Sequence, residues 1–244
     1  MEFWGLTDSG KVRQNNQDVF RMLYDERNGT ALFVVCDGMG GANAGNIASE
    51  LAADTFVEHM TRFLEEAAKP SDASMKMADA VVAANSAVYE KSLSDSEFAG
   101  MGTTLVAALV SPQGEVVANI GDSRLYHVTK SKVCQVTKDH SVVEDMIDRG
   151  DLTRAEARSH PNKNLITRAL GTCQEEEPDV FFLDIYIGDY LLLCSDGLSN
   201  MVSESELLFE LQNSISVRKS CENLVELALS RGAPDNVTAI IFKK

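Results

Sequence analysis

The sequence predicts a layered α+β fold, because its strands and helices come in runs rather than in strict alternation. Four β-rich stretches follow one another between residues 103 and 137, with only two or three turn-forming residues between neighbours. Connections this short favour antiparallel pairing. Two stretches with helical spacing precede this block and two more follow it. We therefore expect antiparallel sheets packed against helices, and not a doubly wound parallel sheet.

The first half of the chain supplies a buried strand and two helices. Ala31–Cys36 is a short apolar run rich in β-formers, which is typical of a buried strand. Apolar residues then recur at steps of three and four, which places each set on one face of a helix. The two sets are Ala52, Phe56, Met60 and Phe63, then Met77, Val81, Ala84 and Val88. Pro70–Ser71 separates the two helices.

The second half begins with a block of strands that we expect to form an antiparallel meander. Its strands are Thr103–Val110, Val116–Ile120, Arg124–Thr129 and Lys132–Thr137. Residues 139–170 are polar and mixed, with a short helical piece at Val142–Arg149. After this stretch we expect strands at Val180–Asp184, Tyr190–Cys194 and Thr238–Phe242, and helices at Glu204–Gln212 and near Cys221–Leu229.

The net charge and the cysteine pattern indicate which partners and which cellular compartment to expect. Lysine and arginine total 22 and aspartate and glutamate 37, so the net charge is −15 at pH 7. Such a chain repels a phosphate backbone or an anionic lipid surface, so we expect neither nucleic acid nor a membrane as partner. No apolar run approaches the ~18 residues of a membrane span, and residues 1–10 do not resemble a signal peptide. The five cysteines form no C-x-x-C pair, which argues against zinc and a disulfide framework and indicates a reducing cytoplasm.

Five aspartates lie where predicted strands begin or end. They are Asp18, Asp37, Asp122, Asp196 and Asp235. Taken singly, Asp-Gly and Asp-Asn are ordinary turn residues. Five carboxylates brought together by a fold would repel one another and would need a counter-charge. Mg²⁺ or Mn²⁺ supplies that charge and prefers oxygen ligands.

Other catalytic chemistries lack their motifs in this chain. There is no P-loop, H-E-x-x-H, EF-hand, G-x-S-x-G, H-R-D or D-F-G pattern. Glycines 38, 40 and 41 fit no dinucleotide-binding pattern. Of the four histidines, His59 and His127 lie in a predicted helix and strand, where structural roles are expected. His140 and His160 lie in the polar stretch and are candidates for a functional role.

The order and spacing of six short segments resemble the metal-dependent protein serine/threonine phosphatases, the protein phosphatase 2C or PPM family, in their short bacterial form. The segments are Arg13-Gln14-Asn15-Asn16-Gln17-Asp18, Asp37-Gly38-Met39-Gly40-Gly41, Gly102-Thr103-Thr104, Gly121-Asp122-Ser123-Arg124, Ser195-Asp196-Gly197 and Asp235-Asn236. Each segment alone is weak evidence for this family. Together, the six segments span nearly the whole chain, and their order and spacing are specific to the family.

The resemblance implies a four-layer α-β-β-α sandwich, with two central antiparallel sheets and helices on both outer faces. Residues 1–244 would form a single catalytic domain with a flap at about 139–170. The implied activity is hydrolysis of phosphoserine and phosphothreonine in proteins, opposing Ser/Thr kinases. A water activated by two tightly bound Mn²⁺ or Mg²⁺ ions would be the nucleophile, and this agrees with the absence of motifs for a protein nucleophile.

The resemblance also assigns the tight metal site. By this resemblance, Asp37 would bridge two cations and the carbonyl of Gly38 would contact one of them. Asp196 and Asp235 bind the other cation. Asp18 supports the site through a water molecule.

Three further positions follow from the same resemblance. Asp122 would hold a third, weaker cation, and Ser159 in the flap would reach that cation. Arg13 would grip the substrate phosphate through its planar guanidinium. Without the family context, a solvated surface arginine is the ordinary interpretation of Arg13.

Two residues depart from the family pattern. Met39 stands where many members carry a histidine that is thought to protonate the leaving group, so the general acid is unassigned. Gln17 stands where glutamate is commoner, and we expect little consequence because Asp18 is kept.

Two other functions are compatible with these residues. A metal-binding pseudo-enzyme would recognise phosphoproteins without hydrolysing them, although the retention of all five aspartates argues against it. A phosphatase with one narrow regulatory substrate, such as a phosphorylated anti-anti-sigma protein, would share the same site. In the main interpretation the partners are phosphoprotein substrates, including a Ser/Thr kinase, and the protein is a cytoplasmic monomer.

Overall fold

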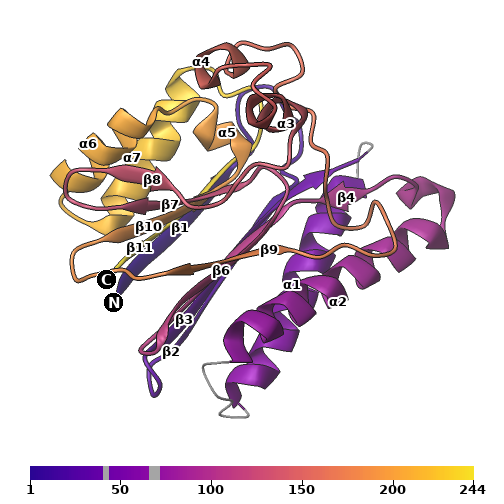
Figure 1. Ribbon diagram of the computed structural model, residues 1–244, viewed down its shortest axis with the longest axis horizontal. Coiled ribbons are helices and arrows are strands. Elements are labelled where there is room, and N and C mark those ends of the chain that lie inside the picture. The colour runs from indigo at the N-terminus through magenta and orange to yellow at the C-terminus, as the bar shows by residue number, and fades with distance from the viewer. Residues whose placement is uncertain (41–43, 66–71) are drawn as a thin grey trace.

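Two antiparallel β-sheets lie face to face, with helices on both outer sides (Figure 1). The structure is a computed structural model that describes residues 1–40, 44–65 and 72–244. Gly41, the Pro70–Ser71 break and the side chain of Phe63 lie outside the described residues. In the described ranges, no helix combines the length and hydropathy that crossing a bilayer requires. The predicted four-layer arrangement is confirmed.

Sheet I has the strand order β1-β11-β10-β7-β8. Its strands are β1 (Glu2–Asp8), β7 (Arg124–Val128), β8 (Val133–Gln135), β10 (Tyr190–Cys194) and β11 (Val237–Lys243). Three helices cover its outer face, namely α5 (Asp196–Ser199), α6 (Glu204–Asn213) and α7 (Val217–Ser230). Apolar side chains on one face of α7, such as Leu224, pack against buried residues of this sheet such as Leu192.

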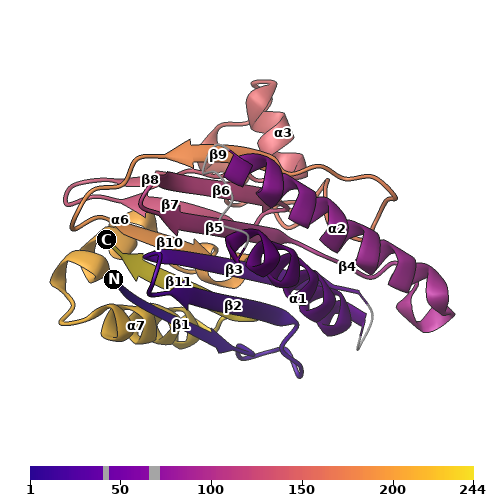
Figure 2. The same ribbon diagram turned by 90° about the horizontal axis from the view of Figure 1, so that it is seen from below.

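Sheet II has the order β2-β3-β5-β6-β9, and a short strand β4 pairs with β3. Its strands are β2 (Asp18–Asp25), β3 (Thr30–Met39), β4 (Gly102–Thr103), β5 (Leu105–Ser111), β6 (Gly114–Ile120) and β9 (Asp179–Leu183). The long helices α1 (Ala44–Glu65) and α2 (Ala73–Ser94) cover its outer face (Figure 2). A 3₁₀ turn, η2 (Ser96–Phe98), follows α2.

Strand β3 is apolar at nearly every position because it is buried on both of its faces. Phe33 and Val35 point into the layer between the two sheets. Leu32 and Val34 point into the layer beneath α1 and α2. Because side chains alternate along a strand, a strand between two apolar layers needs both sets. The buried run predicted at Ala31–Cys36 is therefore confirmed, and the strand extends further at both ends.

The predicted meander is wrong in one respect. β5 pairs with β6 and β7 pairs with β8, but β6 and β7 belong to different sheets. The chain crosses between the sheets at Gly121–Ser123, because the apolar faces of β6 and β7 pack in different layers. Two strands were not predicted from the sequence, namely β1 and β2, which are partly buried edge strands without clear alternation.

Residues 139–170 contain two short helices, α3 (Val142–Asp148) and α4 (Arg154–Ala157). Both lie beyond the ends of the sheets, close to α5 (Figure 1). An isolated bridge between Ser141 and Ile166 joins the two ends of this segment. We call residues 139–170 the flap.

Candidate metal centre

The fold brings the five aspartates together at one end of the sandwich. Asp18 and Asp37 are direct partners on β2 and β3. Asp122 lies in the crossing from β6 to β7, Asp196 is the first residue of α5, and Asp235 precedes β11. Burial raises the pKa of Asp37 well above its ordinary value, and the charges of the other four aspartates raise it further. The convergence that the sequence could only suggest is therefore present.

Burial is also the largest cause of raised pKa values at three other members of the cluster. The pKa rises to about 6 at Asp196, about 7 at Asp18 and about 8 at Asp122. Neighbouring carboxylates add to the shift at each of them. Positive charge from Arg124, Lys163 and Arg13 acts in the opposite direction at Asp196. The cluster therefore favours protons or cations over ionised carboxylates alone.

Asp18 provides the clearest test of whether a cation fits. Its Oδ2 accepts hydrogen bonds from the hydroxyls of Ser195 and Thr238, both at 2.7 Å. Its Oδ1 is buried and has no hydrogen-bond partner among the described residues. A buried, unpaired carboxylate oxygen is costly, and a cation or a water molecule held by one would satisfy it. As they lie in the described ranges, no three His, Cys, Asp or Glu side chains form a group that could hold a metal ion.

The Gly102-Thr103-Thr104 segment holds the backbone of Asp37. The amide of Asp37 donates to Thr104 Oγ1 at 3.0 Å, and the amide of Thr104 donates to the Asp37 carbonyl at 2.9 Å. Thr103 Oγ1 donates to the same carbonyl at 2.9 Å. Thr104 Oγ1 also bonds Ser123 Oγ at 2.7 Å, which ties β3 to the loop that carries Asp122.

Two glycines of the aspartate motifs are required by close backbone contacts. A Cβ on Gly38 would lie 2.1 Å from the carbonyl oxygen of Gly45 at the start of α1. A Cβ on Gly197 would lie 1.9 Å from the carbonyl oxygen of Asn236. Gly38 is inside β3 and Gly197 is inside α5, so neither Asp-Gly pair is a turn. The ordinary turn interpretation is therefore wrong at these two sites.

Asn236 organises the loop that carries Arg13. Its Oδ1 accepts from the amide of Gln17 at 2.8 Å, and its Nδ2 donates to the carbonyls of Ser9 and Asn15 at 2.9 and 3.0 Å. Arg13 Nη2 then donates to Asp235 Oδ2 at 2.8 Å. The hydrogen bond and charge of Asp235 raise the pKa of Arg13, and Asp37 and Asp196 contribute further. With 55% of its side chain exposed, Arg13 stands at the rim of the cluster.

The flap residues are less closely connected to the cluster. Ser159 Oγ donates to the carbonyl of Glu156, and among the hydrogen bonds of the described residues none joins Ser159 to Asp122. His160 Nδ1 accepts from the amide of Asn162. The assignments of Ser159 to a third cation and of His160 to proton transfer stay predictions. Met39 ends β3 opposite Gly102.

A cavity of about 310 Å³ lies between the flap and the segment from α5 to α6. Arg158 and Lys163 line it from the flap, and Asn200 lines it from the end of α5. Asn200 Nδ2 donates to Asp196 Oδ2 at 3.0 Å, so the cavity adjoins the carboxylate cluster. Within the described ranges, the exposed side chains of Arg158 and Lys163 have neither a hydrogen-bond nor an ion-pair partner.

Several residues of the centre had no role attached to them in the analysis of the sequence. Thr104, Arg124, Ser195 and Asn236 stand in the quoted motifs, but only as part of the pattern. Thr238, which holds Asp18 together with Ser195, is a buried residue outside those motifs. Arg124 binds Asp139 through Nε and Nη2, at 2.9 and 2.6 Å, and so connects β7 to the base of the flap. Only the fold reveals these pairings.

Comparison with known proteins agrees with this geometry. The family model described as protein phosphatase 2C matches residues 9–228. Protein phosphatase PhpP of Streptococcus pneumoniae is 37% identical, over 99% of this chain and 96% of that protein. The serine/threonine phosphatase PstP/Ppp of Mycobacterium tuberculosis is 38% identical, with a TM-score of 0.87, covering 98% of this chain and 97% of that one. A further structure, the catalytic domain of PstP in complex with two manganese ions, is 36% identical, with a TM-score of 0.84 and coverage of 98% and 96%. The chain therefore belongs to the protein phosphatase 2C family, the metal-dependent serine/threonine phosphatases.

Proposed function

We propose that this chain hydrolyses phosphoserine and phosphothreonine in phosphoproteins at a binuclear Mn²⁺ or Mg²⁺ centre, and so opposes Ser/Thr kinases. The observation that carries the proposal is the convergence of five aspartates from both sheets, with Arg13 at their rim. The relatives named as serine/threonine phosphatases support the reaction class. Residues 1–244 act as one catalytic domain in this proposal, with residues 139–170 as its flap.

Asp37, the Gly38 carbonyl, Asp196 and Asp235 would hold the two tight ions. Asp18 would support them through water, which agrees with its unpaired Oδ1. The solved PstP domain with two manganese ions supports this count for a relative. When bound, the ions supply an activated water and positive charge for the phosphate oxygens. A third ion would bind more weakly, at Asp122 and Ser159.

The chain's own residues would orient the substrate. Arg13 presents a planar, half-exposed guanidinium that can donate two parallel hydrogen bonds to a phosphate. Its bond to Asp235 aims the guanidinium at the cluster. Ser195 and Thr238 hold the Asp18 carboxylate in one orientation, so little rearrangement is needed during turnover.

A metal-dependence titration tests the proposal. The protein is stripped with EDTA and assayed on p-nitrophenyl phosphate and on a phosphoserine peptide while Mn²⁺ or Mg²⁺ is added back. We expect no turnover in EDTA and recovery on addition of either metal. Full activity in EDTA would end the metal hypothesis. Metal binding without turnover on either substrate would instead indicate the pseudo-enzyme.

A further inference from the structure

His140 is a buried histidine that joins the Asp122 loop to the base of the flap. Its Nδ1 accepts a hydrogen bond from the amide of Gly121 at 3.0 Å. Its own amide donates to the Gly121 carbonyl at 2.9 Å, and its carbonyl accepts from the amide of Thr167 at 2.8 Å. Gly121 directly precedes Asp122 and has a positive φ of 100°. The His140 side chain therefore contacts the point at which the chain crosses between the sheets.

These contacts determine the tautomer of His140. Because Nδ1 accepts the Gly121 N–H, it carries no proton, so the ring proton lies on Nε2. Asp179 Oδ2 lies 3.2 Å from Nε2 and accepts that proton's hydrogen bond. Arg168 Nη1 lies 2.9 Å from Nε2. Because Nη1 and Nε2 both carry protons in this tautomer, they cannot form a hydrogen bond with each other. The Asp179 carboxylate accepts from both groups instead, since its Oδ1 accepts from Arg168 Nη1 at 3.0 Å.

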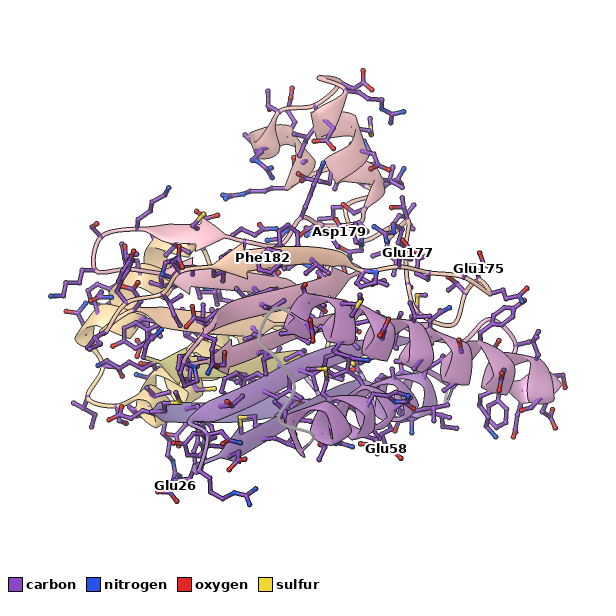
Figure 3. The ribbon with its side chains drawn as sticks, turned by 60° about the horizontal axis from the view of Figure 1, so that its bottom comes forward. Glu26, Glu58, Glu175, Glu177, Asp179 and Phe182 are labelled. Atoms are coloured by element: carbon purple, nitrogen blue, oxygen red, sulfur yellow. The ribbon has the colours of Figure 1, made fainter. Side chains whose placement is uncertain are left out.

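Asp179 lies at the start of β9, at the edge of sheet II (Figure 3). Burial alone would raise the pKa of Asp179, but hydrogen bonds from Arg168 and His140 lower it, so the carboxylate stays ionised. Arg168 also donates through Nε to Glu176 at 2.8 Å. His140 and Arg168 stand at the two ends of the flap segment, so one carboxylate ties both ends to a sheet.

We propose that His140 is a positioning residue for Asp122. By accepting the Gly121 N–H it fixes the loop that carries Asp122, and Asp179 keeps its ring in the tautomer that can accept. This inference rests on the proposed function in a single respect, namely that Asp122 holds the weak third cation. A rigid Asp122 loop lowers the entropy lost when a weakly held ion binds.

Two conservative substitutions separate the two ring nitrogens. In His140→Asn, the amide oxygen stands close to the place of Nδ1 and can still accept from Gly121. In His140→Gln, the amide nitrogen reaches the place of Nε2 and can still donate to Asp179, but the acceptor for Gly121 is lost. Both variants lose the same ring packing, so the difference between them reports on the Gly121 hydrogen bond.

Asp179→Asn tests the tautomer while leaving the imidazole in place. The Asn carbonyl would face Arg168, and its NH₂ group would face Nε2. The ring would then carry its proton on Nδ1, which can no longer accept from Gly121. Glu176→Gln is the matched control, because it removes another carboxylate that binds Arg168 without touching His140.

The measurements are amide hydrogen exchange of the segment around Gly121 and calorimetric binding of Mn²⁺ to the full-length protein. We expect His140→Gln and Asp179→Asn to speed exchange at Gly121 and to weaken the third Mn²⁺ by about tenfold or more. His140→Asn and Glu176→Gln should stay close to wild type in both. Equal effects of His140→Asn and His140→Gln, or unchanged exchange in Asp179→Asn, would overturn the inference. If either His140 variant fails to fold, Asp179→Asn and its control decide the matter.

Asp122→Asn separates this inference from the proposed function. If that variant still binds a third Mn²⁺, the third-cation assignment is wrong. The exchange readout at Gly121 then still decides whether His140 positions the loop.

Discussion

At the scale of single residues, the negative charge of Asp196 is expected to be essential for turnover. Asp196 belongs to α5, is held by Asn200 and receives opposing charge from Lys163 and Arg13. Replacing it with Asn keeps the shape and removes the negative charge. We expect kcat to fall by roughly 10² or more, the size of single electrostatic contributions in other enzymes.

Steady-state kinetics with saturating Mn²⁺ checks this prediction. Asp184→Asn is the control, because Asp184 is an exposed aspartate outside the cluster. An Asp196→Asn enzyme with wild-type kcat would remove Asp196 from the metal centre.

The pH dependence of stability follows from Asp122. Burial and the charge of Asp196 raise its pKa in the folded protein to about 8, above its value in the unfolded chain. At pH values between the unfolded and the folded pKa of Asp122, the folded state binds more protons than the unfolded chain. Asp122 therefore makes the free energy of unfolding fall as the pH rises through this range. In EDTA, Asp122→Asn should therefore raise Tm at pH 8 and leave it nearly unchanged at pH 4, and Asp184→Asn should change neither. Thermal unfolding at the two pH values measures the difference, and a Tm gain as large at pH 4 would contradict it.

Met39 stands at the position where many family members carry the histidine that is thought to protonate the leaving group. The residue ends β3 beside Asp37 and Gly38 and cannot donate a proton. Aryl phosphates need little protonation of the leaving group, whereas a serine alkoxide needs much. Met39→His should therefore raise kcat/KM for phosphoserine peptides more than for aryl phosphates and add a limb to the rate profile near pH ~6.5. Equal effects on both substrates would show that position 39 does not face the leaving group.

At the scale of elements, the flap and α5 together enclose a charged cavity next to the cluster. Arg158 and Lys163 line it without ion-pair partners in the described part of the chain. On a protein of net charge −15, local cations of this kind offset the general repulsion of an acidic phosphopeptide. We expect the cavity to accept an acidic side chain that flanks the phosphorylated residue.

Alanine at both Arg158 and Lys163 tests this expectation. KM for a phosphopeptide with acidic flanks should rise by about tenfold, since exposed charge pairs contribute up to ~1 kcal/mol each. Turnover of p-nitrophenyl phosphate should change little, because that substrate has no flanking residues. Arg149→Ala, an exposed flap arginine paired with Asp151, is the control. A uniform KM rise for neutral and acidic peptides would argue against the cavity as a recognition site.

At the scale of the whole molecule, the aspartate cluster draws its members from both sheets. Asp18 and Asp37 come from sheet II, whereas Asp196 and Asp235 adjoin strands of sheet I. An ion bound by both sets stabilises the folded state only, by about 2.7 kcal/mol at a hundredfold excess over Kd. Each kcal/mol raises Tm by about 2–4 °C in a chain of this size.

We therefore expect Mn²⁺ to raise Tm by roughly 5–11 °C over the EDTA-treated protein. Differential scanning calorimetry with increasing Mn²⁺ measures this shift. Asp37→Asn should lose most of it, because that residue would contact both tight ions. No Tm shift in wild type would mean that the sheets are not joined by a cation.

The amino-acid sequence by itself determined most of the local elements and the residue types of the site. Apolar runs and helical spacing are properties of neighbouring residues, so Ala31–Cys36 and the two long helices could be read directly. The order of the aspartate motifs was enough to indicate the family. The turn interpretation of Asp37-Gly38 failed because the reason for Gly38 is the backbone of Gly45 across the site.

Only the tertiary structure decided which segments meet. The assignment of β6 and β7 to different sheets, and the bond from Asp18 to Thr238 across 220 residues of chain, depend on packing between distant segments. The tautomer of His140 likewise depends on Gly121, Asp179 and Arg168 at once. No local pattern encodes such pairings, because each partner is chosen by the shape and burial of the folded core rather than by its neighbours in the chain.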